Sequence, residues 1–391
     1  MKGRVSVPKR VLILGATGSI GRQTLDVIAR LGGRYVPVGL GAWSRWHELS
    51  ELADATGVKD VALESAKAAE SLAAARPDFR VRGGPGALSA LVEQVTADIV
   101  VVAVAGLAAL GPMLVALHRG LRVAFASKEP LVAAGGLVLE AAKRHGAMLL
   151  PIDSEISAVF QCLQAVRPEW IEKVLLTASG GPFADLSREE LARVTPQQAL
   201  AHPTWRMGPK VTVDSATLMN KGFEVFELHW LFGLAVDKIE VVVHHQSIIH
   251  SAVQLVDSTI LAQAGLPDMR APIQYALTYP ERVASGLPTL DLAEVRRLTF
   301  GRPDMGRFPC LRIAYDAARA GGTYPAALNA ADEVAVEAFL AGRLGFLEIP
   351  QVLESVLEQH DSVPADHLEA VLAADRLARA QAEREIAALS R

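Results

Sequence analysis

The sequence predicts an α/β protein that begins with a doubly wound parallel sheet, continues with an α+β domain and ends in a helical bundle. Three observations support this. Short β-branched runs alternate with amphipathic segments over the first 150 residues, Gly-, Pro- and Ser-rich loops then separate mixed helices and strands, and an Ala-, Leu- and Glu-rich stretch closes the chain. Repeated β-α-β order is typical of a parallel sheet covered by helices on both faces.

Each element is predicted from its own pattern. The β-branched runs of the first part predict strands at Arg10–Leu14, Tyr35–Leu40, Val58–Leu63, Asp98–Ala103, Arg122–Ala126 and Met148–Ile152. Amphipathic spacing between them predicts helices at Ile20–Leu31 and Leu131–His145. The second part is expected to contain helices at Glu155–Gln164 and Leu218–Leu231, and strands at Lys173–Thr177, Ile239–Val243 and Thr259–Gln263.

Composition and charge describe a folded protein without a broad surface field. Hydrophobic residues make up 51% and charged residues 21% of the 391 residues, and the formal net charge is −4. These values exclude a disordered chain and give no extended basic surface for nucleic acid or anionic membrane. Because Cys162 and Cys310 are the only cysteines and lie far apart, no disulfide framework is expected and a reducing compartment fits.

Two apolar stretches bear on targeting. The basic N-terminus precedes only a short apolar run at Val11–Leu14, which is too short for the core of a signal peptide. The uncharged stretch Ile99–Leu117 approaches the length of a membrane span, but two glycines and Pro112 interrupt it. We interpret it as a buried strand, a turn and a helix, and we expect a cytoplasmic protein that does not contact membranes.

A glycine-rich loop, Gly15-Ala16-Thr17-Gly18-Ser19-Ile20-Gly21, follows the first predicted strand and opens the first helix. Glycines allow a sharp turn and a close backbone approach to a pyrophosphate, whose charge is favoured at a helix N-terminus. An ordinary tight βα turn is the alternative. The position at the start of a β-α-β series favours a dinucleotide site in a Rossmann-like domain.

The residues after the second predicted strand indicate which dinucleotide would bind. Enzymes that use NAD usually place Asp or Glu there to hold the ribose hydroxyls. The segment Leu40–Arg45 contains no acid and offers Ser44 and Arg45 instead. This favours NADP, with its 2′-phosphate near those groups, and an Arg45 that belongs to a solvated helix is the alternative.

Acidic residues after the strand Met148–Ile152 are candidate metal ligands. Asp153 and Glu155 lie two residues apart, so in an extended segment both carboxylates point the same way. Ligands of doubly wound sheets bind at the carboxyl ends of the strands. The alternative is that Asp153 or Ser154 caps the helix that begins at Glu155.

A second stretch, Val213–Glu224, places an amide, a cation and a carboxylate on one helical face. Glu224 follows Asn220 by four residues and Lys221 by three. A surface Lys–Glu pair is the alternative. Gly222 in mid-helix costs about 1 kcal/mol relative to Ala, which argues against a plain surface helix.

The metal predicted from these acids is a hard cation. Asp153, Glu155 and Glu224 offer oxygen ligands, which suit Mg²⁺ or Mn²⁺. Zinc fits less well because no Cys/His cluster with ligand spacing is present. One predicted strand carries three histidines, namely His244, His245 and His250. Adjacent residues of a strand point to opposite faces of the sheet, so we interpret these histidines as structural or interfacial.

Two further loops carry polar groups. Ser179-Gly180-Gly181-Pro182 follows a strand and could present a hydroxyl and N–H groups to a phosphate. The segment 202–208 has the composition of a flap that excludes water from a closed site, with His202, Trp205 and Met207 as its side chains of interest. A place in the core is the alternative for Trp205.

Motifs in a fixed order give the chain a family resemblance. G-A-T-G-S-I-G, S-K-E-P-L-V, L-L-P-I-D-S-E, S-G-G-P-F, H-P-T-W-R-M-G, D-S-A-T-L-M-N-K-G and L-P-D-M-R occur between Gly15 and Arg270, and A-L-N-A-A-D-E lies near residue 330. No single motif is specific, but in this order and spacing the chain resembles the 1-deoxy-D-xylulose 5-phosphate reductoisomerase family over almost its entire length.

The resemblance implies an NADPH-binding domain over 1–150, a catalytic, metal-binding and dimerisation domain over 151–278, a linker over 279–305 and a C-terminal helical domain over 306–391, assembled as a homodimer. It implies that Mg²⁺ or Mn²⁺, with Co²⁺ also possible, is held by Asp153, Glu155 and Glu224, which with Lys128 form the catalytic group. Implied substrate contacts are Lys128, Ser154, Glu155, Ser179, His202, Ser215, Asn220, Lys221 and Glu224. Implied cofactor contacts are Thr17, Gly18, Ser19, Ile20, Ala42, Trp43, Ser44, Ser127, Glu129 and Gly208.

The implied reaction rearranges 1-deoxy-D-xylulose 5-phosphate and reduces the resulting aldehyde with NADPH to 2-C-methyl-D-erythritol 4-phosphate, a step of the non-mevalonate isoprenoid pathway. Three departures from the family pattern put individual contacts in question: Ser127 stands where Asn is usual, Trp43-Ser44 replaces a Lys-Asn type of pair, and His245 replaces Pro. Two alternatives are an NADP-dependent dehydrogenase of a small phosphorylated or amino-acid aldehyde, without rearrangement, and a non-catalytic NADPH-sensing module.

Overall fold

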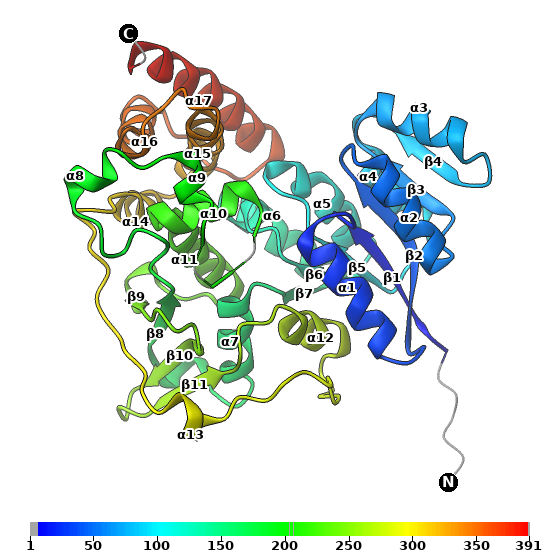
Figure 1. Cartoon of the computed structure of the whole chain (residues 1–391), viewed down its shortest axis with the longest axis horizontal. Helices are drawn as coiled ribbons and strands as arrows, with labels where there is room; N and C mark the ends of the chain where they lie inside the picture. Colours follow the sequence, from blue (N-terminus) through cyan, green and yellow to red (C-terminus); the bar gives the residue numbers. More distant parts are fainter. Residues whose placement is uncertain (1–6, 203, 206, 390–391) are drawn as a thin grey trace. The chain divides into compact units, whose positions relative to one another are not determined.

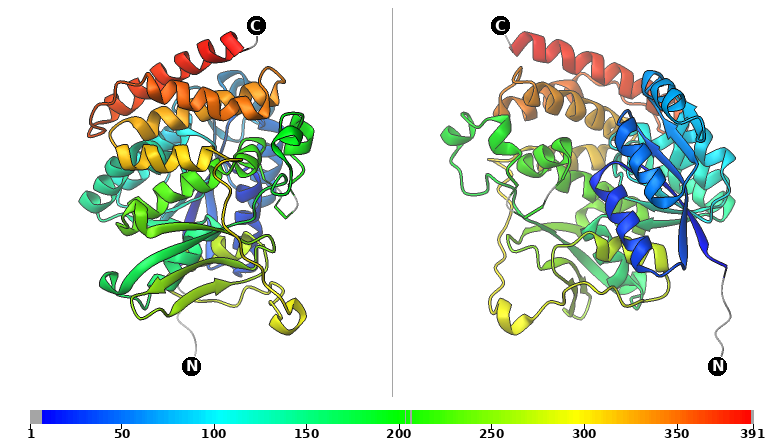
Figure 2. Two further views of the ribbon diagram at one scale, coloured as in Figure 1. Left: turned by 90° about the vertical axis from the view of Figure 1, so that its left-hand side faces the viewer. Right: turned by 45° about the vertical axis from the view of Figure 1, so that its right-hand side comes forward.

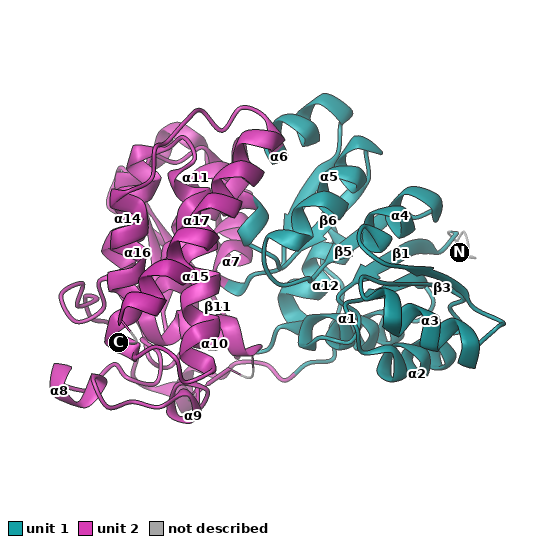
Figure 3. Cartoon of the chain, turned by 90° about the horizontal axis from the view of Figure 1, so that it is seen from above, with its two compact units in different colours: residues 1–130, 138–154, 268–287 teal, residues 131–137, 155–267, 288–391 magenta. Residues whose placement is uncertain are grey.

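The computed structural model describes residues 7–202, 204–205 and 207–389, and the chain forms two compact units (Figures 1 and 3). Unit 1 is formed by the chain up to Pro130, by Val138–Ser154 and by Asp268–Leu287. Unit 2 is formed by Leu131–Leu137, Glu155–Pro267 and the chain from Pro288 onward. Both units are therefore discontinuous in sequence. The predicted division of the chain into four consecutive segments stays a prediction.

Unit 1 contains a seven-stranded sheet in the order β4-β3-β2-β1-β5-β6-β7, with every neighbouring pair parallel. Its strands are β1 (Lys9–Leu14), β2 (Tyr35–Ala42), β3 (Asp60–Leu63), β4 (Arg80–Gly83), β5 (Ile99–Val102), β6 (Arg122–Phe125) and β7 (Met148–Pro151). The four residues of β5 are completely buried because helices cover both faces of a parallel sheet. Strand order reverses between β1 and β5, which creates the switch point where such sheets bind ligands.

The helices of this unit follow its strands. They are α1 (Ser19–Arg30), α2 (Trp46–Thr56), α3 (Ala66–Ala75), α4 (Ala87–Gln94), η1 (Leu107–Ala109), α5 (Leu110–His118), α6 (Glu129–His145), which also reaches into unit 2, and α12 (Arg270–Thr278). The late helix α12 packs against α1, where Arg270 contacts Asp26 at 3.1 Å and Asp268 at 2.6 Å. Residues 268–287 thus return to the first sheet.

The predicted doubly wound sheet is confirmed, and the predicted strands shift by at most two residues at an end. Strand β4 was not predicted, because Arg80 and Arg82 give this short edge strand no apolar run. The stretch Ile99–Leu117 forms β5, η1 and most of α5, as interpreted. No helix among the described residues combines the length and the apolar character needed to cross a membrane.

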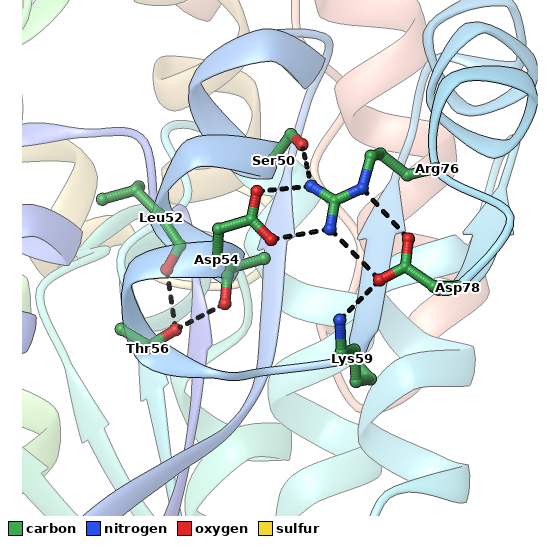
Figure 4. A network of polar contacts seen from close by, with 8 residues as sticks. Ser50, Leu52, Asp54, Thr56, Lys59, Arg76 and Asp78 are labelled. Carbon is green, nitrogen blue, oxygen red and sulfur yellow. Dashed lines mark hydrogen bonds and ion pairs between the residues drawn. The ribbon is translucent and has the colours of Figure 1, made fainter.

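A surface network fastens the outer layer of unit 1 (Figure 4). The guanidinium of Arg76 donates to Asp54 on α2, to Ser50 at 3.1 Å and to Asp78 at 3.0 Å, and Lys59 pairs with Asp78 at 2.5 Å. The two carboxylates are exposed to solvent, and Arg76 is half-buried. We therefore assign them a role in orienting the α3–β4 connection rather than a large share of stability.

Unit 2 contains a mixed four-stranded sheet in the order β11-β10-β8-β9. Its strands are β8 (Ile171–Ala178), β9 (Ile239–Val243), β10 (Ile249–Leu255) and β11 (Ile260–Ala264). Strand β10 is antiparallel to both neighbours, whereas β8 and β9 are parallel. The helical pieces of this part are α7 (Ser154–Leu163), η2 (Pro168–Trp170), α8 (Arg188–Leu191), α9 (Pro196–Ala199), α10 (Pro209–Thr217), α11 (Met219–Phe232), η3 (Val236–Lys238) and α13 (Leu292–Val295).

The C-terminal part of unit 2 is helical, as predicted. It contains α14 (Cys310–Ala320), α15 (Tyr324–Leu340), η4 (Phe346–Glu348), α16 (Ile349–Glu358) and α17 (Leu368–Leu389). The orange and red helices α15, α16 and α17 lie side by side in both views of Figure 2 and contact one another. Their apolar faces join one core with the side chains of α11 and β8.

Helix α11 is buried because α14 packs directly on its glycine. A Cβ atom at Gly222 would lie 2.4 Å from the Cβ atom of Ala314. The expectation that this helix is not a plain surface helix is therefore confirmed, and the reason is close helix packing. Its buried side includes Phe223 and Phe226, while Asn220 remains half-buried.

We predict that Gly222→Ala lowers the thermal unfolding midpoint. Overpacking typically costs about 1–3 kcal/mol, which outweighs the gain of about 1 kcal/mol in helix propensity. In the double variant with Ala314→Gly this Cβ–Cβ contact is absent. The double variant should therefore be more stable than the sum of the two single effects predicts. Gly301→Ala is the control, because no heavy atom lies within 4 Å of that added Cβ. A higher midpoint for Gly222→Ala alone would refute this packing argument.

Candidate active site

The loop after β7 carries Asp153 and the first turn of α7 carries Glu155, so the two carboxylates do not lie in one extended segment as predicted. Strand β7 ends at Pro151, Asp153 and Ser154 follow, and Glu155 lies in the first turn of α7. Lys128 precedes α6 at the end of the neighbouring strand β6, and its Nζ lies 2.5 Å from an Asp153 carboxylate oxygen. Both side chains are almost buried. Adjacent parallel strands therefore bring an ammonium group and a carboxylate together at their carboxyl ends.

Helix α11 presents the second group on one face, as its spacing predicted. The Asn220 amide donates to Glu224 Oε1 at 2.6 Å, and Lys221 Nζ lies 2.7 Å from Glu224 Oε2. Lys221 also reaches Glu155 Oε1 at 3.0 Å. The Glu224 side chain is fully buried. Lys221 thus links carboxylates that lie 69 residues apart in sequence.

The predicted ligand oxygens meet. One carboxylate oxygen from each of Asp153, Glu155 and Glu224 lies within 4.8 Å of the other two, and no other such group of three or more His, Cys, Asp or Glu occurs in the described part of the chain. Oxygens bonded to one Mg²⁺ at about 2.0–2.1 Å are at most about twice that distance apart, so small side-chain shifts suffice. The donor set fits a hard divalent cation.

A hydroxyl–imidazole cluster lies in unit 2, which also contains Glu155 and Glu224. His202 Nε2 lies 3.1 Å from Ser179 Oγ, just after β8, and 3.2 Å from Ser215 Oγ on α10. The backbone N–H groups of Thr204 and Trp205 both donate to His202 Nδ1. Because Nδ1 accepts, the ring proton resides on Nε2, and burial lowers the pKa of His202, which favours the neutral ring.

The loop that carries Ser179 depends on glycine. Gly180 and Gly181 both have positive φ, and a Cβ at Gly181 would lie 2.6 Å from the backbone oxygen of Ser215. This close approach brings Ser179 and Ser215 to the same imidazole. The cluster offers hydroxyl groups and one N–H group, which is the donor chemistry of a phosphate site.

The predicted flap precedes α10. Trp205 and Met207 are half-buried, and the Trp205 ring lies 6.3 Å from the ring of His250. Gly208 is exposed and is the N-cap residue of α10. Two residues of the predicted flap motif, Pro203 and Arg206, lie outside the described residues. Trp205 does not belong to the fully buried core.

The glycine-rich loop has the expected geometry in unit 1. Gly15 has a φ of +82°, and a Cβ there would lie 2.1 Å from the backbone oxygen of Ala103. The N–H groups of Gly15 and Ala16 both donate to Gly41 O at 2.9 Å, which ties the loop to the end of β2. Helix α1 then begins after Gly18 with no side-chain cap and no acid in its first turn. These features leave its amino end suited to a phosphate.

The remaining predicted cofactor residues lie at strand ends of unit 1. Ala42 ends β2, Trp43 is 59% exposed and Ser44 precedes α2. Ser127 is buried, and its hydroxyl donates to the backbone oxygen of Val104 at 2.5 Å. The hydroxyl of Ser127 therefore fastens the β5 and β6 loops to each other. Glu129, which lies two residues after Ser127 and is the first residue of α6, is buried as well.

One prediction about the histidines was wrong. His244 and His245 lie after the end of β9 in the turn to β10, and only His250 lies on a strand. The buried His244 contacts Thr299 O through Nδ1 at 2.8 Å, and its Nε2 accepts from the N–H groups of Ile248 and Ile249. The β-branched run ends at Val243, so strand spacing could not be extended across the pair.

A buried group of three charged side chains on α10 and α15 was not predicted from the sequence. Lys210 Nζ lies 2.6 Å from Asp214 and 2.7 Å from Asp332, and both acids are almost completely buried. This contact joins α10, which carries Ser215, to α15. The i, i+4 spacing of Lys210 and Asp214 was a usable signal, whereas Asp332 could be found only from the fold.

Comparisons with known proteins give one consistent result. Family models described as 1-deoxy-D-xylulose 5-phosphate reductoisomerase, its C-terminal domain, and the DXP reductoisomerase C-terminal domain match residues 11–135, 149–232 and 264–381. A 1-deoxy-D-xylulose 5-phosphate reductoisomerase of Pelotomaculum thermopropionicum is 50% identical over 95% of this chain and 97% of its own length. One of Heliobacterium modesticaldum is 51% identical, over 95% and 96%.

Solved structures agree. A DOX-P reductoisomerase in complex with NADPH, fosmidomycin and magnesium has a TM-score of 0.94 and 39% identity, over 97% of this chain and 99% of that one. The enzyme of Zymomonas mobilis in complex with NADPH has a TM-score of 0.89 and 40% identity, over 97% and 99%. The chain belongs to the 1-deoxy-D-xylulose 5-phosphate reductoisomerase family.

Proposed function

We propose that this protein rearranges 1-deoxy-D-xylulose 5-phosphate and reduces the product with NADPH to 2-C-methyl-D-erythritol 4-phosphate. The observation that carries the proposal is the group of three carboxylates within 4.8 Å, with Lys128 and Lys221 beside them. An aldehyde dehydrogenase that catalyses no rearrangement would not need this cluster of carboxylates. A non-catalytic NADPH sensor would not need it either.

Asp153, Glu155 and Glu224 are the proposed ligands of Mg²⁺ or Mn²⁺, and their oxygens also suit Co²⁺. When bound, such an ion acts as a Lewis acid toward the keto and hydroxyl oxygens of the substrate. Lys221 keeps two of the three carboxylates in place through its contacts at 2.7 and 3.0 Å. The remaining ligand, Asp153, is oriented by Lys128 at 2.5 Å.

Lys128 and Ser154 are the proposed contacts to the reacting end of the substrate. Lys128 Nζ is almost buried and can donate a hydrogen bond, or move a proton, at a substrate oxygen beside Asp153. Its position as the residue before α6 fixes the start of its side chain. Hydrogen bonds from fixed donors stabilise the negative charge that develops on substrate oxygens.

The phosphate group of the substrate is proposed to bind Ser179, His202, Ser215, Asn220 and Lys221. The neutral His202 directs its Nε2–H toward the two serine hydroxyls, and Asn220 and Lys221 supply an amide and a cation from α11. Binding energy at a non-reacting phosphate orients the carbon skeleton for the chemical step. The flap residues Trp205 and Met207 are proposed to exclude water once the substrate is bound.

NADPH is proposed to bind the first domain. Thr17, Gly18, Ser19 and Ile20 would hold the pyrophosphate at the amino end of α1, and Ala42, Trp43 and Ser44 would line the adenosine half. Further proposed contacts are Ser127, Glu129 and Gly208. NADPH supplies the hydride for the reduction.

The proposed assembly is a homodimer in the cytoplasm. Within the described residues β11 pairs with β10 alone, so its other edge is open to a second strand, and Ile260, Ala262 and Ala264 are exposed along it. An open edge with exposed apolar side chains favours pairing with a second copy. Cys162 and Cys310 are both free thiols, which fits a reducing compartment.

Product analysis by NMR tests the proposal. Incubation with deoxyxylulose phosphate, NADPH and Mg²⁺ should give the branched methylerythritol phosphate, and NADPH oxidation should stop in excess EDTA and return with Mn²⁺. An unbranched alcohol as product, or undiminished turnover after complete metal removal, would exclude a reductoisomerase and favour the dehydrogenase alternative.

We predict that Glu224→Gln lowers the steady-state rate by at least about a hundredfold and changes the affinity for NADPH only a little. The amide keeps the size of the side chain but loses the negative charge that a divalent ion needs. Steady-state rates at saturating Mg²⁺ and fluorescence titration of NADPH provide the two measurements. Glu140→Gln, an exposed acid on α6, is the charge-matched control. Near-normal turnover of Glu224→Gln would contradict its assignment as a ligand.

We predict that His202→Asn raises the substrate KM by about tenfold and changes kcat less, because one hydrogen bond to a charged group is worth about 1.5–3 kcal/mol. Asn can still accept from the N–H groups of Thr204 and Trp205, but it cannot reach the two serines. His367→Asn, at an exposed site, is the control. A fall in kcat at unchanged KM would instead assign His202 to the chemical step.

A further inference from the structure

Two arginines of unit 1 converge on a single carboxylate oxygen beside the loop that follows β2. Arg22 on α1 and Arg45 before α2 both contact Oε2 of Glu48, and the Arg45 contact measures 3.4 Å. Arg22 also donates from Nε to Thr17 O at 3.3 Å, within the glycine-rich loop. The guanidinium of Arg22 is therefore held between that loop and the first turn of α2.

This position coincides with the place where a doubly wound dinucleotide domain binds the adenosine ribose. The glycine-rich loop and the end of β2 touch through the two N–H bonds to Gly41 O. In enzymes of this fold, an acid at the end of the second strand holds the ribose hydroxyls of NAD, whereas a nearby Arg accommodates the 2′-phosphate of NADP. Strand β2 ends at Ala42, so no acid stands at its end.

The charge at this site favours a phosphate. Two guanidinium groups face the one carboxylate of Glu48, which leaves one excess positive charge. A phosphate monoester carries about −1.5 to −2 charges at neutral pH and accepts paired hydrogen bonds from guanidinium forks. All three side chains are at least about one-third exposed, so a ligand can reach them without unfolding the loop.

We propose that Arg22 and Arg45 bind the 2′-phosphate of NADPH and set the preference for NADPH over NADH, with Glu48 holding both guanidinium groups in place. This inference rests on the proposed use of NADPH and names the residues that select it. Arg22 comes from the helix that begins at the glycine-rich loop, and it supplies the cation that Trp43 and Ser44 lack. Arg45 supplies the second cation from the loop after β2.

The opposite role for Glu48 is the competing explanation. If Glu48 held the ribose hydroxyls as the acid of an NAD enzyme does, Glu48→Gln would weaken NADH binding. If Glu48 only orients the arginines, Glu48→Gln should leave NADH affinity unchanged within about twofold, since NADH has no phosphate at this position.

Binding measurements on the full-length protein test the proposal without relying on turnover. NADPH and NADH are titrated by fluorescence, and 2′,5′-ADP and 5′-AMP by calorimetry. Arg22→Met should weaken the binding of NADPH and of 2′,5′-ADP by about tenfold, which is about 1.4 kcal/mol, because one charged hydrogen bond to the phosphate is lost. It should change the affinities for NADH and 5′-AMP by less than about twofold. Arg22→Met combined with Arg45→Met should abolish the preference.

Arg30→Gln is the matched control. It removes one positive charge from the same helix, about 12 Å farther along α1, where Arg30 pairs with Asp26 at 2.9 Å. It should leave all four affinities unchanged.

Unchanged 2′,5′-ADP affinity in Arg22→Met, or equal losses for NADPH and NADH, would overturn the inference while leaving the proposed reaction intact. Conversely, a selective loss of NADPH binding in a protein that does not convert deoxyxylulose phosphate would support the inference and refute the proposed reaction.

Discussion

The proposed chemistry depends on keeping three carboxylates close together in a mostly buried place. Two like charges 4.8 Å apart repel by roughly 3 kcal/mol at an effective dielectric constant of about 20. The chain offsets this repulsion with Lys128 beside Asp153 and with Lys221 between the two glutamates. Three acids against two ammonium groups leave an excess negative charge, which a divalent cation can neutralise. Lys128 and Lys221 thus reduce the repulsion between the carboxylates and also fix the orientations of the carboxylate oxygens.

The scaffold around these charges is built from close backbone contacts. Helix α11 can present Lys221 and Glu224 because Gly222 lets α14 approach from the other side. Helix α10 is fastened to α15 by the triad around Lys210, which fixes the helix that carries Ser215. The C-terminal helices α14 and α15 therefore help to position α11 and α10, although none of the predicted metal ligands lies on those C-terminal helices.

Much of this arrangement was predictable from local patterns, and the remainder depended on tertiary structure. Buried parallel strands such as β5 have uninterrupted β-branched runs, and the spacing of Lys221 and Glu224 predicted their common face. By contrast, β4 carries arginines, and nothing local indicates that Asp153 meets Glu224 or that Arg22 meets Glu48. Contacts between distant segments are set by how helices and sheets pack, which periodicity does not encode. The functional roles followed from the family resemblance.

A crystal structure of the protein grown with Mn²⁺, with anomalous diffraction recorded at the manganese edge, would show directly whether the three carboxylates bind one cation. We expect one strong anomalous peak bonded to oxygens of Asp153, Glu155 and Glu224, with Lys221 Nζ still in contact with a glutamate. A peak elsewhere on the chain, or manganese bonded to fewer than two of these carboxylates, would contradict this expectation.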